Sequence, residues 1–167
     1  MRLPASIFLV ALGFFFEAAV AGFLNLRGLE PDLLLAIVCS LAILQGAGHG
    51  ALYGLLSGLA LDALFGHMGF YSASYFFAAF LCGYFARTMR FDQWVLPGLA
   101  FLLAALLKEF YALAYLFFMD VAFAWGAALL KALIHCLFSA CAFLGLHFLL
   151  SKLYGGDLFA RGRRGRL

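Results

Sequence analysis

Charged residues are scarce in this sequence. Lys, Arg, Asp and Glu together make up 11% of the 167 residues, whereas hydrophobic residues make up 67%. Soluble domains are typically about half apolar and about a quarter charged. A water-soluble fold has no interior large enough for this much apolar surface. The composition therefore predicts an integral membrane protein with almost no soluble part.

The patterns of nucleic-acid, metal and nucleotide sites are also missing. The net charge is only +3, and the basic residues lie mainly at the ends of apolar segments and at the C-terminus, where membrane topology explains them. The four cysteines lie inside apolar runs without a Cys-x-x-Cys pair, and the four histidines show no metal-site spacing. No glycine-rich loop precedes a Lys-Ser or Lys-Thr pair. We expect no cofactor, no metal and no nucleic acid.

The residues of a membrane peptidase are poorly represented. Ser57 with His135 loosely resembles a serine peptidase pair, but Asn25 is the only asparagine, so side-chain oxyanion donors are scarce. Asp62 and Asp120 loosely resemble an aspartyl pair, but no asparagine-containing motif surrounds either residue. We therefore expect no catalytic residues and a protein that is not an enzyme.

Long apolar segments separated by short polar breaks dominate what is present. At roughly 20 residues per span, the chain has room for about six transmembrane helices. We expect an all-α six-helix bundle, a single transmembrane domain at residues 1–151, followed by a basic cytoplasmic tail at 152–167. The expected spans are about 5–26, 31–45, 50–65, 70–87, 94–118 and 122–150. The second is short for a full crossing, which predicts that it is partly buried in protein.

Basic residues predict the orientation of these spans. Cytoplasmic loops of inner-membrane proteins carry an excess of Lys and Arg. If both termini are cytoplasmic, Arg27 is the only basic loop residue on the outer side. The cytoplasmic side then holds the other loop and terminal basic residues: Arg2, Arg87, Arg90, Lys152, Arg161, Arg163, Arg164 and Arg166. The sequence therefore predicts a multi-pass protein of the bacterial inner membrane with both ends in the cytoplasm.

The N-terminal segment has a second interpretation. Arg2, the apolar stretch 7–16 and the small residues 19–21 are typical of a cleavable signal peptide. Glu17 and the unbroken apolar run through Leu26 favour a retained helix. We expect the first span to be retained.

Small residues recur every four positions in the middle of the chain. The step is carried by Gly46, Gly50, Gly54, Gly58, Asp62 and Gly66, with Gly69 following. Glycine in a membrane helix lets a neighbouring backbone approach closely. We expect a slanting stripe on one helix that packs against another helix of the same chain; dimerisation or a partner helix is the alternative.

Five ionisable side chains fall within the expected spans. They are Glu17, Asp62, Lys108, Glu109 and Lys131, all predicted to lie in the outer half of the membrane. Intramembrane charges usually face a bundle interior or a cavity. We expect one polar cluster that opens toward the outer side. In the alternative interpretation, Lys131 and Asp62 reach the interface separately.

A motif near the second span resembles a known family. Pro31 and Asp32 open the run Pro-Asp-Leu-Leu-Leu, and the glycine step follows, with Gly83-Tyr84 in the fourth span. With Glu109 in the fifth span and a basic C-terminus, this pattern resembles MreD, a membrane component of the bacterial rod-shape machinery. Lys108, Lys131 and His135 depart from the family's pattern.

The resemblance implies a non-enzymatic scaffold. Members are similar in fold to the substrate-binding membrane subunits of energy-coupling-factor vitamin transporters. Expected partners are an MreC-like bitopic protein, a RodA-like glycosyltransferase, a class B penicillin-binding protein, MreB filaments indirectly, and membrane lipid. The alternative function is a small-molecule-binding subunit of a vitamin transporter, because an outward polar cluster would also suit a substrate pocket.

Overall fold

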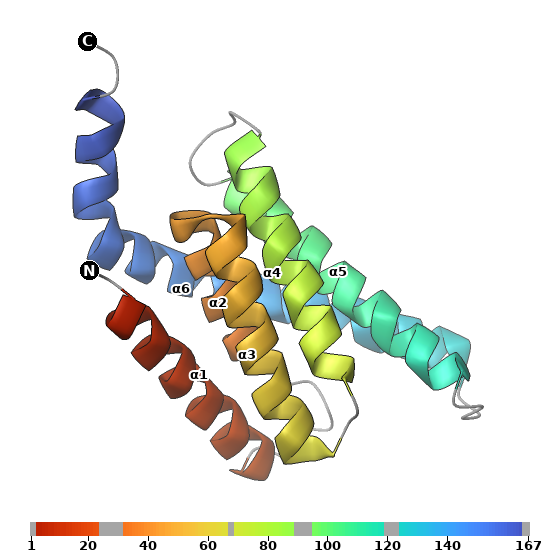
Figure 1. Cartoon of the computed structure of the whole chain (residues 1–167). Coiled ribbons are helices and arrows are strands. Elements are labelled where there is room, and N and C mark those ends of the chain that lie inside the picture. Colours follow the sequence, from red (N-terminus) through yellow and green to blue (C-terminus); the bar gives the residue numbers. More distant parts are fainter. Residues whose placement is uncertain (1–2, 24–31, 67–68, 89–94, 119–123, 165–167) are drawn as a thin grey trace.

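The computed structural model describes residues 3–23, 32–66, 69–88, 95–118 and 124–164, and these ranges are helical apart from short turns (Figure 1). Six helices follow one another along them: α1 (Leu3–Phe23), α2 (Leu33–Gln45), α3 (Ala47–Phe65), α4 (Phe70–Thr88), α5 (Val95–Phe118) and α6 (Trp125–Arg164). The all-helical class predicted from the apolar segments is confirmed.

Two of the helices are long and apolar enough to cross a membrane by length and composition. These segments are Pro97–Phe118 in α5 and Trp125–Lys152 in α6. Shorter apolar segments occur at Pro4–Ala19, Leu33–Gln45 and Phe70–Ala86. Large hydrophobic side chains such as Phe110 and Phe118 are exposed at 74% and 82%. Exposed apolar surface of this kind is what hydrocarbon, rather than water, can solvate.

The short helix α2 is the centre of the molecule. It packs against each of the other five helices, and all residues from Leu34 to Ala42 are buried. A helix that is apolar on every side is stable only when it is surrounded by protein or lipid. The prediction that the second segment is buried in protein is confirmed.

Helices α3 and α4 pack unusually closely because of three glycines. A Cβ atom at Gly54 would lie 2.5 Å from the carbonyl oxygen of Tyr75, and one at Gly58 would lie 2.5 Å from that of Tyr71. A Cβ at Gly50 would meet Ala42 of α2 as well as α4. These glycines therefore pack within the chain, where a larger residue would force two backbones apart.

The expected glycine stripe is shorter than predicted. Gly46, Gly66 and Gly69 have positive φ angles of 102°, 73° and 78° and lie in the turns at helix ends. Glycine adopts this left-handed region without the steric penalty of a side chain. The four-residue step thus contains both glycines that pack between helices and glycines that form turns. The prediction of a single packing stripe from Gly46 to Gly69 was wrong.

Helices α5 and α6 pair beside this core. Phe101 and Phe143 stack with their ring centroids 4.2 Å apart, and Phe143 stacks in turn on His147 at 5.3 Å. In Figure 1 the end of α5 and the start of α6 reach the lower right, and α6 runs from there behind α2 to the left. The helix α6 continues to Arg164, past the expected end of the sixth span near residue 150, and its dark blue C-terminal part turns away from the rest of the helix (Figure 1).

Candidate functional site: a charged cluster at the start of α2

Asp32 forms the N-terminal cap of α2. Its side chain accepts a hydrogen bond from the backbone amide of Leu35 at 2.9 Å, and the residue is only 2% exposed. The first turn of a helix leaves backbone amides without partners, and a capping carboxylate satisfies one of them. This cap is needed because the helix start is buried away from water.

Three other helices supply partners for Asp32. The Tyr75 hydroxyl of α4 donates to Oδ1 at 2.5 Å, and Lys108 of α5 forms an ion pair with Oδ2. The Asp32 amide donates to the Ser139 hydroxyl of α6 at 3.1 Å. Tyr75 and Ser139 are both buried. Asp32 therefore joins α2 to α4 and α5 through its carboxylate, and to α6 through its backbone amide.

Glu17 of α1 binds the same helix start. Its Oε2 accepts hydrogen bonds from the amides of Leu33 at 3.1 Å and Leu34 at 3.4 Å. Acidic groups are favourable at the positive end of the helix dipole. The group formed by Glu17, Asp32, Tyr75, Lys108 and Ser139, here called the Asp32 cluster, thus links five of the six helices.

Asp62 lies outside the Asp32 cluster and caps a different helix. Its two carboxylate oxygens accept hydrogen bonds from the amides of Tyr71 and Ser72, each at 2.9 Å. These amides belong to the first turn of α4. Asp62 therefore fastens the end of α3 to the start of α4, at the end of the row of packing glycines.

The remaining predicted charges occupy two further places. Glu109 of α5 bonds His135 of α6, with Oε1 and Nδ1 2.7 Å apart. Lys131 is exposed, and among the residues that the structure describes it makes no hydrogen bond or ion pair.

The prediction that the five charged residues form one cluster was wrong, because they lie at separate sites. Lys108 and Glu109 point about 100° apart as neighbours on a helix, and so they bind different elements. Glu17 and Asp62 bind backbone amides at helix starts rather than lysines. Tyr75 and Ser139 were not predicted to belong to the Asp32 cluster, because tyrosine and serine are common in apolar helices. Asp32 was predicted as part of the family motif but not as a member of the polar cluster, and Pro31, which precedes it in the motif, lies outside the described residues.

A second polar contact joins helices at the opposite end of α2. The Gln45 amide donates to the Ser6 hydroxyl of α1 at 2.5 Å, and the Tyr53 hydroxyl of α3 donates to Gln45 at 3.0 Å. Helix α2 is thus held at both ends by side chains of its neighbours.

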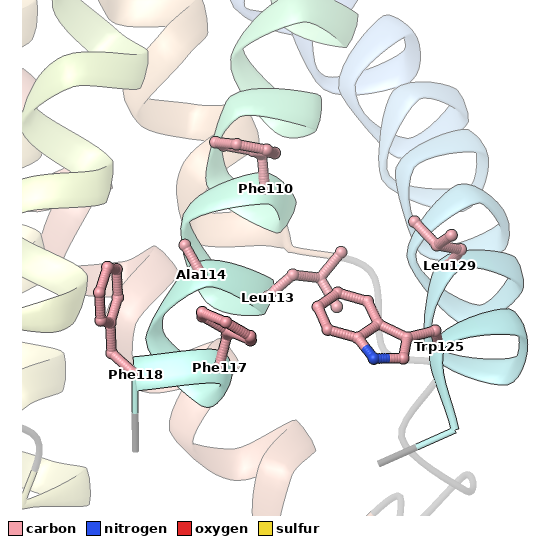
Figure 2. A pocket seen from close by; sticks show the side chains of 7 residues that line it. All are labelled: Phe110, Leu113, Ala114, Phe117, Phe118, Trp125 and Leu129. Carbon is pink, nitrogen blue, oxygen red and sulfur yellow. The ribbon is translucent and has the colours of Figure 1, made fainter. Parts of the chain in front are cut away.

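A cavity between the ends of α5 and α6 has no reactive groups in its lining. It is an open pocket of about 360 Å³, and Figure 2 shows the aromatic rings and aliphatic chains around it. The lining residues are Phe110, Leu113, Ala114, Phe117, Phe118, Trp125 and Leu129. Such a surface suits hydrocarbon, and it supplies no acid, base or nucleophile.

Ser57 and His135, considered for a serine peptidase, lie on α3 and α6, which do not pack against each other in the described part of the chain. The Ser57 hydroxyl donates to the carbonyl oxygens of Tyr53 at 2.7 Å and Gly54 at 3.1 Å in its own helix. His135 is engaged with Glu109. Asp120, the proposed partner of Asp62, lies outside the described residues. Within the described ranges, no group of three or more His, Cys, Asp or Glu side chains is placed to hold a metal ion.

Comparisons with protein-family models, with curated proteins and with solved structures returned no match.

Proposed function

We propose that this protein is a multi-pass scaffold of the bacterial inner membrane that serves the cell-wall elongation machinery, as MreD-like proteins do. In this proposal all six helices cross or line the membrane bundle, and both termini are cytoplasmic. The partners are an MreC-like bitopic protein and, with it, a RodA-like glycosyltransferase and a class B penicillin-binding protein. MreB filaments are reached indirectly.

The Asp32 cluster is the observation that carries the proposal. Asp32 belongs to the motif that resembles the MreD family, and it is also the residue on which four helices converge. Lys108 and Asp32 pair with each other and Glu17 binds backbone amides, and none of the three lines the cavity between α5 and α6. A saturated polar core of this kind rigidifies a bundle. Rigidity with apolar outer faces suits a protein that positions others in the membrane.

Helix lengths are compatible with the six-span topology. A 19-residue helix such as α3 extends about 28 Å at 1.5 Å per residue, close to the hydrocarbon thickness of about 30 Å. Only α2, with 13 residues, is too short. Its burial from Leu34 to Ala42 removes the need to match the lipid, because its ends meet protein groups.

Depletion of the protein in its source bacterium tests this function. We expect rod-shaped cells to become round and the incorporation of labelled wall precursor along the cylinder to fall. Plasmid-borne wild-type protein and the neutral variant Gly48→Ala should both restore rods. Unchanged shape, together with lost uptake of a vitamin, would contradict the proposal and favour a transporter subunit.

A further inference from the structure

Lys131 differs from the other ionisable side chains predicted to lie within the membrane. Glu17, Lys108, Asp62 and Glu109 all bind groups of this chain. Lys131 is exposed and has no hydrogen-bond or ion-pair partner in the part of the chain that the structure describes. The nearest acid along the α5–α6 pair, Glu109, is already bound to His135.

The position of Lys131 makes an unpaired charge costly. It lies about 9 Å along the helix axis from Trp125, the first residue of α6, at 1.5 Å per residue. Lysines placed within a transmembrane segment are expensive unless they pair or reach the interface. A neighbouring carboxylate at the same depth would supply the missing counter-charge.

The surface around Lys131 is an open helix face. Exposed residues at alternating steps of four and three, the repeat by which two helices pack side by side, form what we call the Lys131 face: Ala127, Lys131, Ile134, Phe138, Cys141 and Gly145. A Cβ atom at Gly145 would have no neighbour within 4 Å. Among the helices that the structure describes, α6 packs only against α2 and α5, and both contact its opposite side.

We propose that the Lys131 face binds a transmembrane helix of a partner protein, and that this helix carries an Asp or Glu that pairs with Lys131. The proposal rests on the scaffold function, which requires a membrane partner, and it specifies where and by which charge that partner binds. The small residues Ala127 and Gly145 allow the two backbones to approach closely at both ends of the face. Lys131 then supplies specificity, because an apolar helix without a carboxylate leaves it unpaired.

Site-specific photo-crosslinking in native membranes tests the inference. A photoreactive amino acid at Ile134, which is 43% exposed, probes the Lys131 face, and one at Leu59 of α3, which is 50% exposed, serves as the control. We expect Ile134 to capture one membrane protein through an apolar segment that contains Asp or Glu. The Leu59 probe should give lipid adducts. Lys131→Met should reduce the protein adduct at least tenfold, and Lys131→Arg should retain it.

The decisive experiment exchanges the two charges between Lys131 and the acid of the partner. Lys131→Glu should abolish the adduct, and replacing the partner's acid with Lys should restore it. Lipid adducts alone at Ile134, capture of a second copy of this chain, or an adduct indifferent to Lys131→Met would each overturn the inference. Thermal unfolding of the purified Lys131→Met protein at the wild-type temperature excludes misfolding as the cause.

The two proposals fail in different ways. A charge-dependent adduct with a protein unrelated to wall synthesis would retain the Lys131 pairing and refute the elongation role. Co-purification of wall-elongation proteins that is insensitive to Lys131→Met, with no adduct at Ile134, would refute the pairing alone.

Discussion

Lys108 of α5 forms an ion pair with Asp32, the residue that caps the start of α2. Both side chains are largely removed from solvent, with exposures of 12% and 3%. Replacing one member of a buried pair leaves the other charged and uncompensated, which is far more damaging than replacing both. The pair therefore stabilises the buried start of the central helix.

Lys108→Met should destabilise the protein strongly. We expect the free energy of unfolding in mild detergent to fall by about 3–5 kcal/mol, because Asp32 loses its counter-charge in a buried site. The matched control is Lys131→Met, which exchanges the same residue types on the neighbouring helix α6 at an exposed position. That change should alter stability by less than about 0.5 kcal/mol. Equal tolerance of the two variants would show that the Asp32 cluster does not hold the core.

Adding Asp32→Asn to Lys108→Met should recover much of the lost stability. Asparagine keeps an oxygen that can cap α2, while the unpaired negative charge disappears. Unfolding monitored for both single variants and the double variant gives the interaction energy of the pair. Strictly additive losses would mean that the two side chains act independently.

Gly58→Ala should separate α3 from α4. The new Cβ would lie 2.6 Å from the amide nitrogen of Ser72, so backbone must move. Overpacking of this kind typically costs about 1–3 kcal/mol. Gly48→Ala in the same helix has no neighbour within 4 Å and should be neutral or stabilising, since alanine is the better helix former. Similar unfolding temperatures for both variants would refute the close packing at Gly58.

Asp62→Ala should weaken the start of α4. Two backbone amides lose their acceptor, and we expect a loss of about 2 kcal/mol. Asp62→Asn keeps one oxygen acceptor and should lose about half as much. Hydrogen exchange localises the effect: the amides of Tyr71 and Ser72 should exchange faster in Asp62→Ala. Unchanged protection of these two amides would contradict the cap.

The four cysteines should differ in reactivity. Cys141 is exposed on α6, whereas Cys39, Cys82 and Cys136 are buried. A hydrophobic maleimide should therefore label one thiol per folded chain in detergent and four after denaturation. Cys141→Ser should remove the label from the folded protein. Rapid labelling of Cys39 without denaturation would contradict the enclosure of α2.

The helices themselves were largely predictable from sequence, because each is an apolar run closed by a polar or glycine-containing break. The expected segments 70–87 and 94–118 correspond to α4 (Phe70–Thr88) and α5 (Val95–Phe118) within one residue at each end. The short length of the second segment correctly indicated that this helix is buried in protein. The apolar segment of α6 ends at Lys152, close to the expected end near residue 150, whereas the helix itself continues to Arg164.

The pairing of the charged side chains was not predictable from sequence. Which residues meet depends on the rotation and tilt of each helix, and an apolar sequence specifies these only through packing. The partners of Glu17 and Asp62 are backbone amides, and because every residue type except proline has one, the sequence does not indicate which amides they bind. Asp32 before an apolar run did carry a usable signal as an N-terminal cap. Only the tertiary structure shows that Tyr75, Lys108 and Ser139 bind Asp32.

The proposed role in wall elongation is tested most directly by purifying the tagged protein from its native membrane in mild detergent and identifying the co-purifying proteins by mass spectrometry. The account predicts recovery of an MreC-like bitopic protein together with a RodA-like glycosyltransferase and a class B penicillin-binding protein. Recovery of a transmembrane coupling subunit with two ATPases, and none of the wall proteins, would contradict it.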